Sequence, residues 1–334
     1  MRGWRSMPEN PVVMRSRLRL SIEMSRLEMD VLSQIVAAMT TGRPQSFLVE
    51  GHPPWGRRFS SAPGAGVHVM LEGQTMLLPP GGEPVRLDVG DVLLLPRGAG
   101  HGLASSPDVP LIDVEHPSQR SVAGPVTIGP DRLSARGPRS RMLCGTYRLD
   151  TSRQAPLLRR LPASVVLETG AGRHPELSAV VALLVRELTQ SAPGRPLAVG
   201  SLLDLLLVET LRAWFRQHPY ENWAAELSDP LITDALRYLH DHPQRSWTVA
   251  ELAEAVGLSR AAFARRFTDR VGQPPLAYLT SWRMLMASRL LRDENRVLAD
   301  IAHSVGYSSS YAFANAFKRV HGVAPGTYRQ SSAT

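Results

Sequence analysis

The side chains best suited to metal or acid–base chemistry in this sequence of 334 residues lie in its first half. They are His68, Glu72, His101 and Cys144, which is the only cysteine. Imidazole nitrogens, carboxylate oxygens and thiolate sulfurs are common metal ligands, and a site usually needs three or four of them. The two histidines supply two ligands, Glu72 is the candidate third, and Cys144 or His116 could approach from elsewhere.

The alternative is that His68 and His101 line the interior of a domain and form hydrogen bonds there. We favour this alternative, because the two histidines make only two ligands and Glu72 is no more than a candidate for the third. The sequence therefore predicts interior histidines at positions 68 and 101 and no catalytic residue. It predicts no required cofactor, and a metal is the less favoured occupant.

The second chemistry that the sequence offers is electrostatic. The net charge is +8, and it is concentrated at the two ends of the chain. Residues 230–334 contain 13 Arg or Lys against 8 Asp or Glu, and residues 1–20 contain five Arg against one Glu. Basic domains favour polyanions such as nucleic acids. The preference for Arg itself says little, because Lys318 is the only lysine in the chain.

Composition limits the other classes of protein. A single cysteine excludes an intrachain disulfide and suits the reducing cytoplasm, where we expect the protein to reside. No apolar run approaches the roughly 18 residues needed to cross a membrane. The densest apolar stretch, residues 201–215, contains Asp204, Glu209 and Arg212, which is typical of a buried amphipathic helix. We therefore expect no membrane partner.

Two segments near the end of the chain repeat the same spacing of small, aromatic and turn-forming residues. The offset is 49 residues for the first two pairs and 50 for the rest, so the second segment has one additional residue. The pairs are Ala253 and Ala302, Gly257 and Gly306, Phe263 and Phe313, Phe267 and Phe317, Gly272 and Gly322, Pro275 and Pro325, and Tyr278 and Tyr328.

Each segment has the pattern of a helix-turn-helix. In the first, Ala253 lets two helices approach closely, and Gly257 can take the left-handed conformation that ends a helix. Ser259 is the expected cap of the next helix, and its partner in the second segment is Ser308 or Ser309. A helix over residues 275–293 joins the segments and can hold two recognition helices about one DNA turn, roughly 34 Å, apart.

The rest of the chain predicts a second domain and a helical connection. Short apolar runs separated by Gly and Pro over residues 46–128 indicate a small barrel or sandwich. A helix is expected over residues 21–41, and two long helices are expected within residues 176–216. These two helices have more apolar surface than they can bury against each other, so they must pack on a neighbour or on a second subunit.

The C-terminal segments resemble the AraC/XylS family of transcription regulators. The resemblance covers residues 230–330 and rests on "WTVAELAEAVGLSRAAFARRF", "GQPPLAYLTSWRMLMASRLL" and "IAHSVGYSSSYAFANAFKRVHGVAPGTYR". It implies a double-stranded DNA target and RNA polymerase as a partner. It also implies that the exposed faces of the second helix of each unit read bases.

Carried over to this sequence, the resemblance assigns contacts to both units. The first reader would present Arg260, Ala261, Ala264 and Arg265, and the second Ser309, Ser310, Tyr311, Asn315, Lys318 and Arg319. Arg265 is suited to guanine and Asn315 to adenine, because each side chain can pair with two atoms of that base. Lys318 and Arg319, at the far end of the helix, are better placed for phosphate.

The first half resembles the cupin-type sensor domain that precedes many such readers. "GDVLLLPRGAGH" (90–101) fits the second cupin motif up to His101, but Ser105 stands where that motif ends in Asn. The first motif requires two His before Glu, and "VHVMLEG" supplies only His68 and Glu72. The resemblance to a sensor implies a small-molecule pocket at His68, Glu72 and His101.

We therefore predict an α+β multidomain protein: an N-terminal cupin-like β-barrel, a helical linker or dimerisation segment, and a C-terminal all-α double helix-turn-helix domain. The expected divisions are a disordered basic tail (1–20), a sensor (21–140), a helical coupling and dimerisation region (141–228) and the DNA-binding domain (229–331). The predicted function is sequence-specific transcription regulation, as a homodimeric activator controlled by a small-molecule effector. The alternative is a cupin-type metalloenzyme with a vestigial DNA-binding domain.

Overall fold

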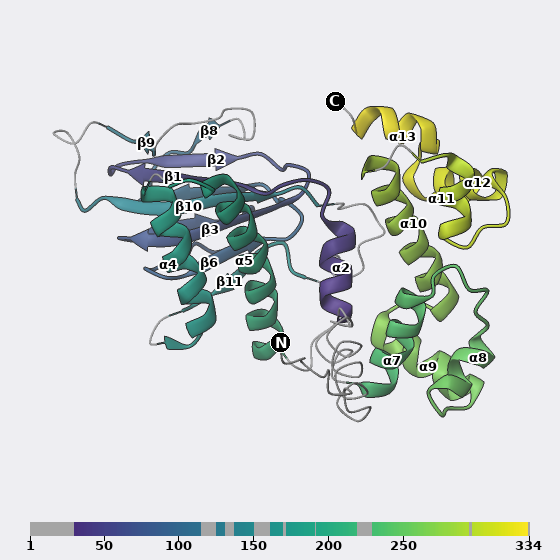
Figure 1. Cartoon of the computed structure of the whole chain (residues 1–334). Coiled ribbons are helices and arrows are strands. Elements are labelled where there is room, and N and C mark those ends of the chain that lie inside the picture. The colour runs from purple at the N-terminus through teal and green to yellow at the C-terminus, as the bar shows by residue number, and fades with distance from the viewer. Residues whose placement is uncertain are drawn as a thin grey trace, which may run out of the picture.

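The computed structural model describes residues 30–114, 125–130, 137–149, 161–169, 172–190, 192–218, 229–293 and 296–332. A β-rich half and an all-helical half stand side by side in Figure 1. This agrees with the predicted α+β fold with a cupin-like half and a helical reader. The tail expected over residues 1–20 lies outside the described residues. Within the described ranges, no helix combines the length and apolarity that crossing a membrane requires.

The β-rich half consists of two sheets that share one core. The strands are β1 (Gln45–Gly51), β2 (Gly56–Phe59), β3 (Ala65–Glu72), β4 (Thr75–Leu78), β5 (Val85–Leu87), β6 (Val92–Leu95), β7 (His101–Ala104), β8 (Ile112–Val114), β9 (Val126–Ile128), β10 (Ser140–Tyr147) and β11 (Val165–Leu167). Their order is β11-β6-β3-β10-β1-β9 in one sheet and β5-β4-β7-β2-β8 in the other. Apolar side chains from both sheets fill the space between them, including Met70, Leu77, Leu93 and Leu103.

The sheet extends beyond residue 140, where the sequence placed the end of the sensor. Strand β10 lies inside the six-stranded sheet, paired with β3 on one side and β1 on the other, and β11 forms its edge beside β6. Strand β10 has eight residues but is buried almost throughout, and β11 has only three, so neither shows the alternation by which a strand is predicted from sequence.

Two helices, α4 (Pro175–Thr189) and α5 (Arg195–Gln217), pack against each other, and α5 contacts β1 and β11. They lie along one face of the six-stranded sheet (Figure 1). The Tyr147 hydroxyl of β10 donates to the Leu203 carbonyl of α5 at 2.8 Å, which ties the pair to the sheet. The apolar surplus predicted for these helices is thus partly buried against the β-rich half.

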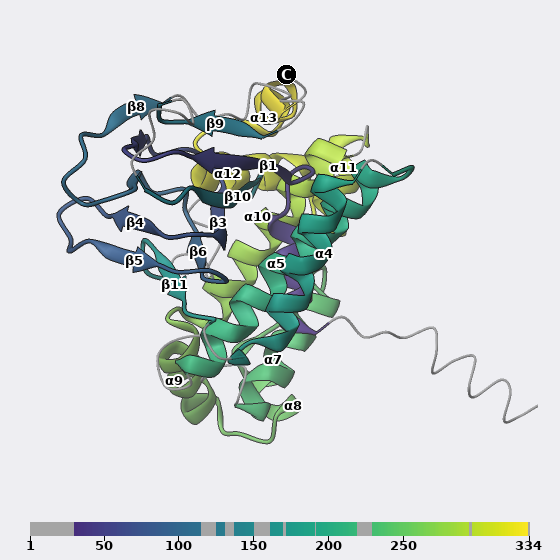
Figure 2. The same ribbon diagram turned by 90° about the vertical axis from the view of Figure 1, so that its left-hand side faces the viewer.

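The first described helix, α2 (Val31–Met39), joins the two halves. Asp30 caps it by accepting a hydrogen bond from the Ser33 backbone N–H. It packs against α7 (Pro230–Asp241) and α10 (Pro275–Asp293) of the helical half. Figure 1 shows α2 between the sheets and the C-terminal helices, and Figure 2 again shows it beside α10. The sequence predicted a helix here but not that it would bridge the halves.

The helical half contains the two repeated units, and α10 joins them. Unit one comprises α8 (Val249–Ala255) and α9 (Arg260–Val271), and unit two comprises α11 (Leu298–Ser304) and α12 (Ser310–His321); α13 (Pro325–Ser332) follows. Gly257 and Gly306 both have positive φ, at 72° and 82°, as the turn requires. Ser259 caps α9 and Ser309 caps α12, so the second turn is one residue longer, as the change of offset predicts.

Candidate nucleic-acid interface

The first recognition helix, α9, separates a core face from an exposed face. Phe263 and Phe267 are fully buried and pack against each other with ring centroids 5.5 Å apart. On the other side Arg260, Ala261 and Arg265 are exposed, while Ala264 is half-buried. The aromatic pair at i and i+4 therefore fixes the rotation of the helix and turns the predicted contact residues outward.

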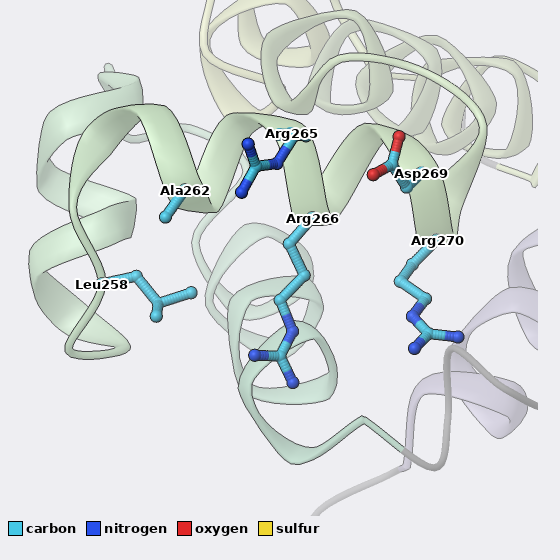
Figure 3. A pocket seen from close by; sticks show the side chains of 6 residues that line it. All are labelled: Leu258, Ala262, Arg265, Arg266, Asp269 and Arg270. Atoms are coloured by element: carbon cyan, nitrogen blue, oxygen red, sulfur yellow. The ribbon is translucent and has the colours of Figure 1, made fainter.

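A concave surface runs along α9 beside this face. Its lining is Leu258, Ala262, Arg265, Arg266, Asp269 and Arg270. Figure 3 shows Arg266 and Arg270 leaving the same side of the helix, one turn apart, while Arg265 leaves in another direction. Three guanidinium groups and one carboxylate give the surface a positive charge, which suits a phosphate backbone.

Arg266 is bound within the protein. Its Nε donates to Asp229 Oδ2 at 2.7 Å, and a terminal nitrogen donates to Asp229 Oδ1 at 3.0 Å. Arg270 Nε lies 3.9 Å from the same carboxylate. This cluster was not predicted from the sequence. The signal available was a pair of arginines at i and i+4, with an acidic residue at the expected start of α7, two helices earlier.

The second recognition helix, α12, has the same construction and different contact residues. Phe313 and Phe317 are buried, and Ser309 serves as the cap. The predicted contact residues Tyr311, Asn315, Lys318 and Arg319 are exposed, Tyr311 to 79%, while Ser310 is half-buried. Lys318 and Arg319 lie in the last turn, where positive charge also complements the helix dipole. This face carries fewer guanidinium groups than that of α9.

Arg283 of α10 ties the two units to each other. Its guanidinium donates to the carbonyl oxygens of Pro243 at 2.7 Å and Arg245 at 2.9 Å, both in the loop before α8. The same group lies over the Tyr307 ring in the turn of the second unit, 5.9 Å from its centroid. Burial lowers the pKa of Arg283. One side chain thus contacts both units, and this limits their relative movement.

The two sheets of the β-rich half are joined by a pair of buried histidines. His68 on β3 and His101 on β7 approach through their Nε2 atoms at 3.1 Å. His68 Nδ1 lies 3.1 Å from the Cys144 thiol, and His101 Nδ1 lies 3.0 Å from the Ala99 carbonyl oxygen. Phe59 stacks on His101 with centroids 4.9 Å apart.

The hydrogen-bond directions follow if both imidazoles are neutral. A carbonyl only accepts, so His101 Nδ1 carries the hydrogen and donates to Ala99. His101 Nε2 then accepts from His68 Nε2, and His68 Nδ1 accepts from the Cys144 thiol. Burial raises the pKa of Cys144, which keeps its proton on the sulfur. Both histidines thus line the interior between the sheets and form hydrogen bonds there.

Glu72 does not join these histidines, and the sequence was wrong to place it in their pocket. It lies at the end of β3, where its carboxylate accepts from Arg139 at 2.8 Å and Arg141 at 3.3 Å. Two guanidinium groups at the start of the neighbouring strand attract it there. The pocket includes Cys144 instead, and its volume is about 40 Å³. Among the residues that the structure describes, no three His, Cys, Asp or Glu side chains are arranged to hold a metal ion.

Comparison with known proteins supports both halves. A family described as Cupin matches residues 30–216, and one described as Helix-turn-helix domain matches residues 252–331. A Streptomyces lividans protein named as an AraC-like transcription regulator is 34% identical over 90% of this chain and 98% of that protein. The transcriptional regulator AlkR of Acinetobacter baylyi is 28% identical over 91% of this chain and all of AlkR. The RCS-specific transcriptional activator RclR of Escherichia coli is 28% identical over 79% of this chain and 83% of RclR.

These relatives are transcription regulators rather than enzymes, and they share both the cupin and the helix-turn-helix parts of the sequence. Both capped helices, α9 and α12, lie within the residues that the helix-turn-helix family matches. The chain belongs to the AraC family of DNA-binding transcription regulators, with an N-terminal cupin region and a C-terminal helix-turn-helix domain.

Proposed function

We propose that this regulator is a sequence-specific activator that reads two adjacent major grooves and responds to a small molecule held in its cupin region. The observation that carries the proposal is the pair of recognition helices, α9 and α12, whose polar faces are exposed while α10 and Arg283 connect their units. Two recognition helices connected by one rigid helix, α10, suit two half-sites that lie about one helical turn apart on one side of the duplex.

Selection from a randomised DNA pool by the full chain tests the reading mode. The expected result is two short conserved blocks whose centres lie about 10 base pairs apart. Enrichment of a single block would mean that only one of the two helices, α9 or α12, reads bases. Absence of any enrichment would contradict sequence-specific binding altogether.

The effector site proposed is the space between the two sheets, at His68, His101, Cys144 and Phe59. A volume of about 40 Å³ is far below the roughly 300 Å³ of ordinary ligand pockets, so an effector must widen it. Such widening would break the histidine bridge and change how the sheets pack, which gives a small molecule a route to the rest of the protein.

A panel of small molecules, screened by the shift in melting temperature, tests this site. A true effector raises the melting temperature of the wild type, because it binds only the folded state. The shift is expected to disappear in His101→Leu and to persist in His303→Leu, whose histidine is exposed on α11. An equal shift in both variants would place the effector elsewhere.

The activator role rests on one relative, because RclR is named as an activator. RNA polymerase is the proposed partner, and a homodimer is the proposed assembly. Transcription in vitro from a promoter with the selected site upstream should increase when the chain is added. A decrease would make the protein a repressor, and sedimentation of the full chain would measure its oligomeric state.

A further inference from the structure

Asp229 is the first described residue of the helical half, and its carboxylate is almost fully buried, with 4% of the side chain exposed. It has two structural roles. Its Oδ1 accepts from the Ile232 backbone N–H at 3.4 Å and so caps α7. Both oxygens also accept from Arg266 of the recognition helix α9, at 2.7 and 3.0 Å.

The contact between Asp229 and Arg266 has a defined geometry. The two contacts form a bidentate pair, the strongest and most directional arrangement of guanidinium and carboxylate. A buried carboxylate without a partner is strongly unfavourable, so this pair resists separation. Arg270, one turn along α9, approaches the same carboxylate at 3.9 Å. Both cations are therefore drawn to one side of α9.

Arg265 is the neighbour of Arg266 and points in another direction (Figure 3). Successive residues on a helix are about 100° apart, so holding Arg266 sets the direction of Arg265. The core rings Phe263 and Phe267 limit the rotation of α9 from one side, and Asp229 limits it from another.

We propose that Asp229 is a positioning residue for the first DNA reader: by holding Arg266 it sets the direction in which Arg265 meets bases, and it keeps Arg266 and Arg270 from binding phosphate indiscriminately. The inference rests on the proposed base-reading role of Arg265. The same carboxylate also fixes the start of α7, so the chain entering the reader and the helix that reads DNA share one anchor.

The test uses the full chain and the site that the wild type selects. Asp229→Asn keeps an oxygen that can cap α7 but removes the charge that holds the arginines. The expected result is a gain of severalfold in affinity for unrelated DNA and a steeper dependence of that affinity on salt, because two cations are released to phosphate. Discrimination between the selected site and unrelated DNA should fall about tenfold.

Two further variants separate positioning from simple phosphate binding. Arg266→Met should leave the salt dependence unchanged, because its guanidinium is already occupied; a phosphate contact would lower the slope by about one. Asp229→Asn with Arg266→Gln replaces the ion pair by a neutral pair and leaves Arg270 as the one released cation, so it should show about half of the steepening that Asp229→Asn shows. Asp234→Asn is the matched control, since Asp234 pairs with Arg237 on α7 at 2.9 Å and both residues are half-buried.

Failure of base reading and failure of the positioning role of Asp229 give different results. If the wild type selects no site, base reading itself fails. If Arg265→Ala relaxes one base position and Asp229→Asn changes neither discrimination nor salt dependence, base reading stands and the positioning role is wrong. An equal loss of affinity for both kinds of DNA, with a lower melting temperature, would also overturn it, because this is the signature of a residue needed only for folding.

Discussion

At the scale of the residue, two adjacent arginines have different surroundings. Arg265 is exposed on the face of α9 that the sequence predicted to contact DNA. The guanidinium of Arg266, in contrast, is bound by the carboxylate of Asp229. Their order in the sequence does not reveal this difference, because it depends on where residue 229 lies in space. The exposure of the reader residues was predictable from the spacing of Phe263 and Phe267, since those positions fix the opposite face.

Replacing Arg265 by Ala should weaken binding to the selected site by about 1–3 kcal/mol and relax preference at one base position. The reason is the loss of a guanidinium that can pair with guanine O6 and N7. Binding titrations and a second selection with the variant measure both effects. Arg237→Ala, on α7, should leave the selected sequence unchanged; an unaltered selection by Arg265→Ala would contradict base reading.

At the scale of the element, the two units are alike in their glycine turns and different in what surrounds them. Gly257 and Gly306 have the same left-handed conformation at equivalent positions. A Cβ on Gly257 would meet no atom within 4 Å, but one on Gly306 would lie 2.7 Å from the Arg283 guanidinium and 2.9 Å from the Pro243 carbonyl oxygen. The repeat predicted both turns, while the crowding of the second depends on the long-range contact of α10.

Gly306→Ala should therefore destabilise the protein more than Gly257→Ala. The conformational strain alone costs about 1 kcal/mol at either position. At Gly306 the displaced Arg283 also loses its bonds to two carbonyl groups, which adds about 1–3 kcal/mol. Urea unfolding of the two variants under the same conditions measures the difference. Equal stability of the two would show that Arg283 moves aside without cost.

At the scale of the whole molecule, α2 connects the cupin half to the helical half, and its Gln34 forms hydrogen bonds with residues of α7. His240 of α7 donates through Nδ1 to Gln34 Oε1 of α2 at 2.7 Å and, as a neutral ring, accepts at Nε2 from the Tyr278 hydroxyl at 2.6 Å. Gln34 donates in turn to Asp241 at 2.9 Å. Periodicity predicted the helix, but no local pattern could indicate which distant surface it would cover.

Burial lowers the pKa of His240 from 6.5 to about 3, and this makes the stability of the protein depend on pH. Between these two values the unfolded chain binds a proton at this residue and the folded chain does not. Stability is therefore highest above pH 6.5 and falls as the pH decreases, by about 2 kcal/mol at pH 5.

Urea unfolding at pH 7 and pH 5 measures this change. His240→Gln should show a smaller loss of stability between the two pH values than the wild type. His303→Gln, which alters an exposed histidine of α11, should retain the full loss. An equal loss in both variants would mean that His240 keeps its ordinary pKa in the folded state.

The helical half should bind DNA without the cupin half, because both recognition helices and α10 lie within it. A fragment of residues 228–334 should bind duplex DNA with an affinity that falls as salt rises. An electrophoretic shift measured from low to high salt provides the test. Absence of binding at low salt would contradict the division of roles between the halves.

The two recognition helices are connected by α10 and expose different side chains: Arg265 on α9, and Tyr311 with Asn315 on α12. A single chain bound to DNA is therefore asymmetric along the duplex, and its binding site need not be a palindrome. Inverting the site at a promoter, with its centre kept in place, would exchange the positions of α9 and α12 along the duplex. The cupin half would then face the opposite way along the DNA, so the orientation of the site becomes a signal in its own right.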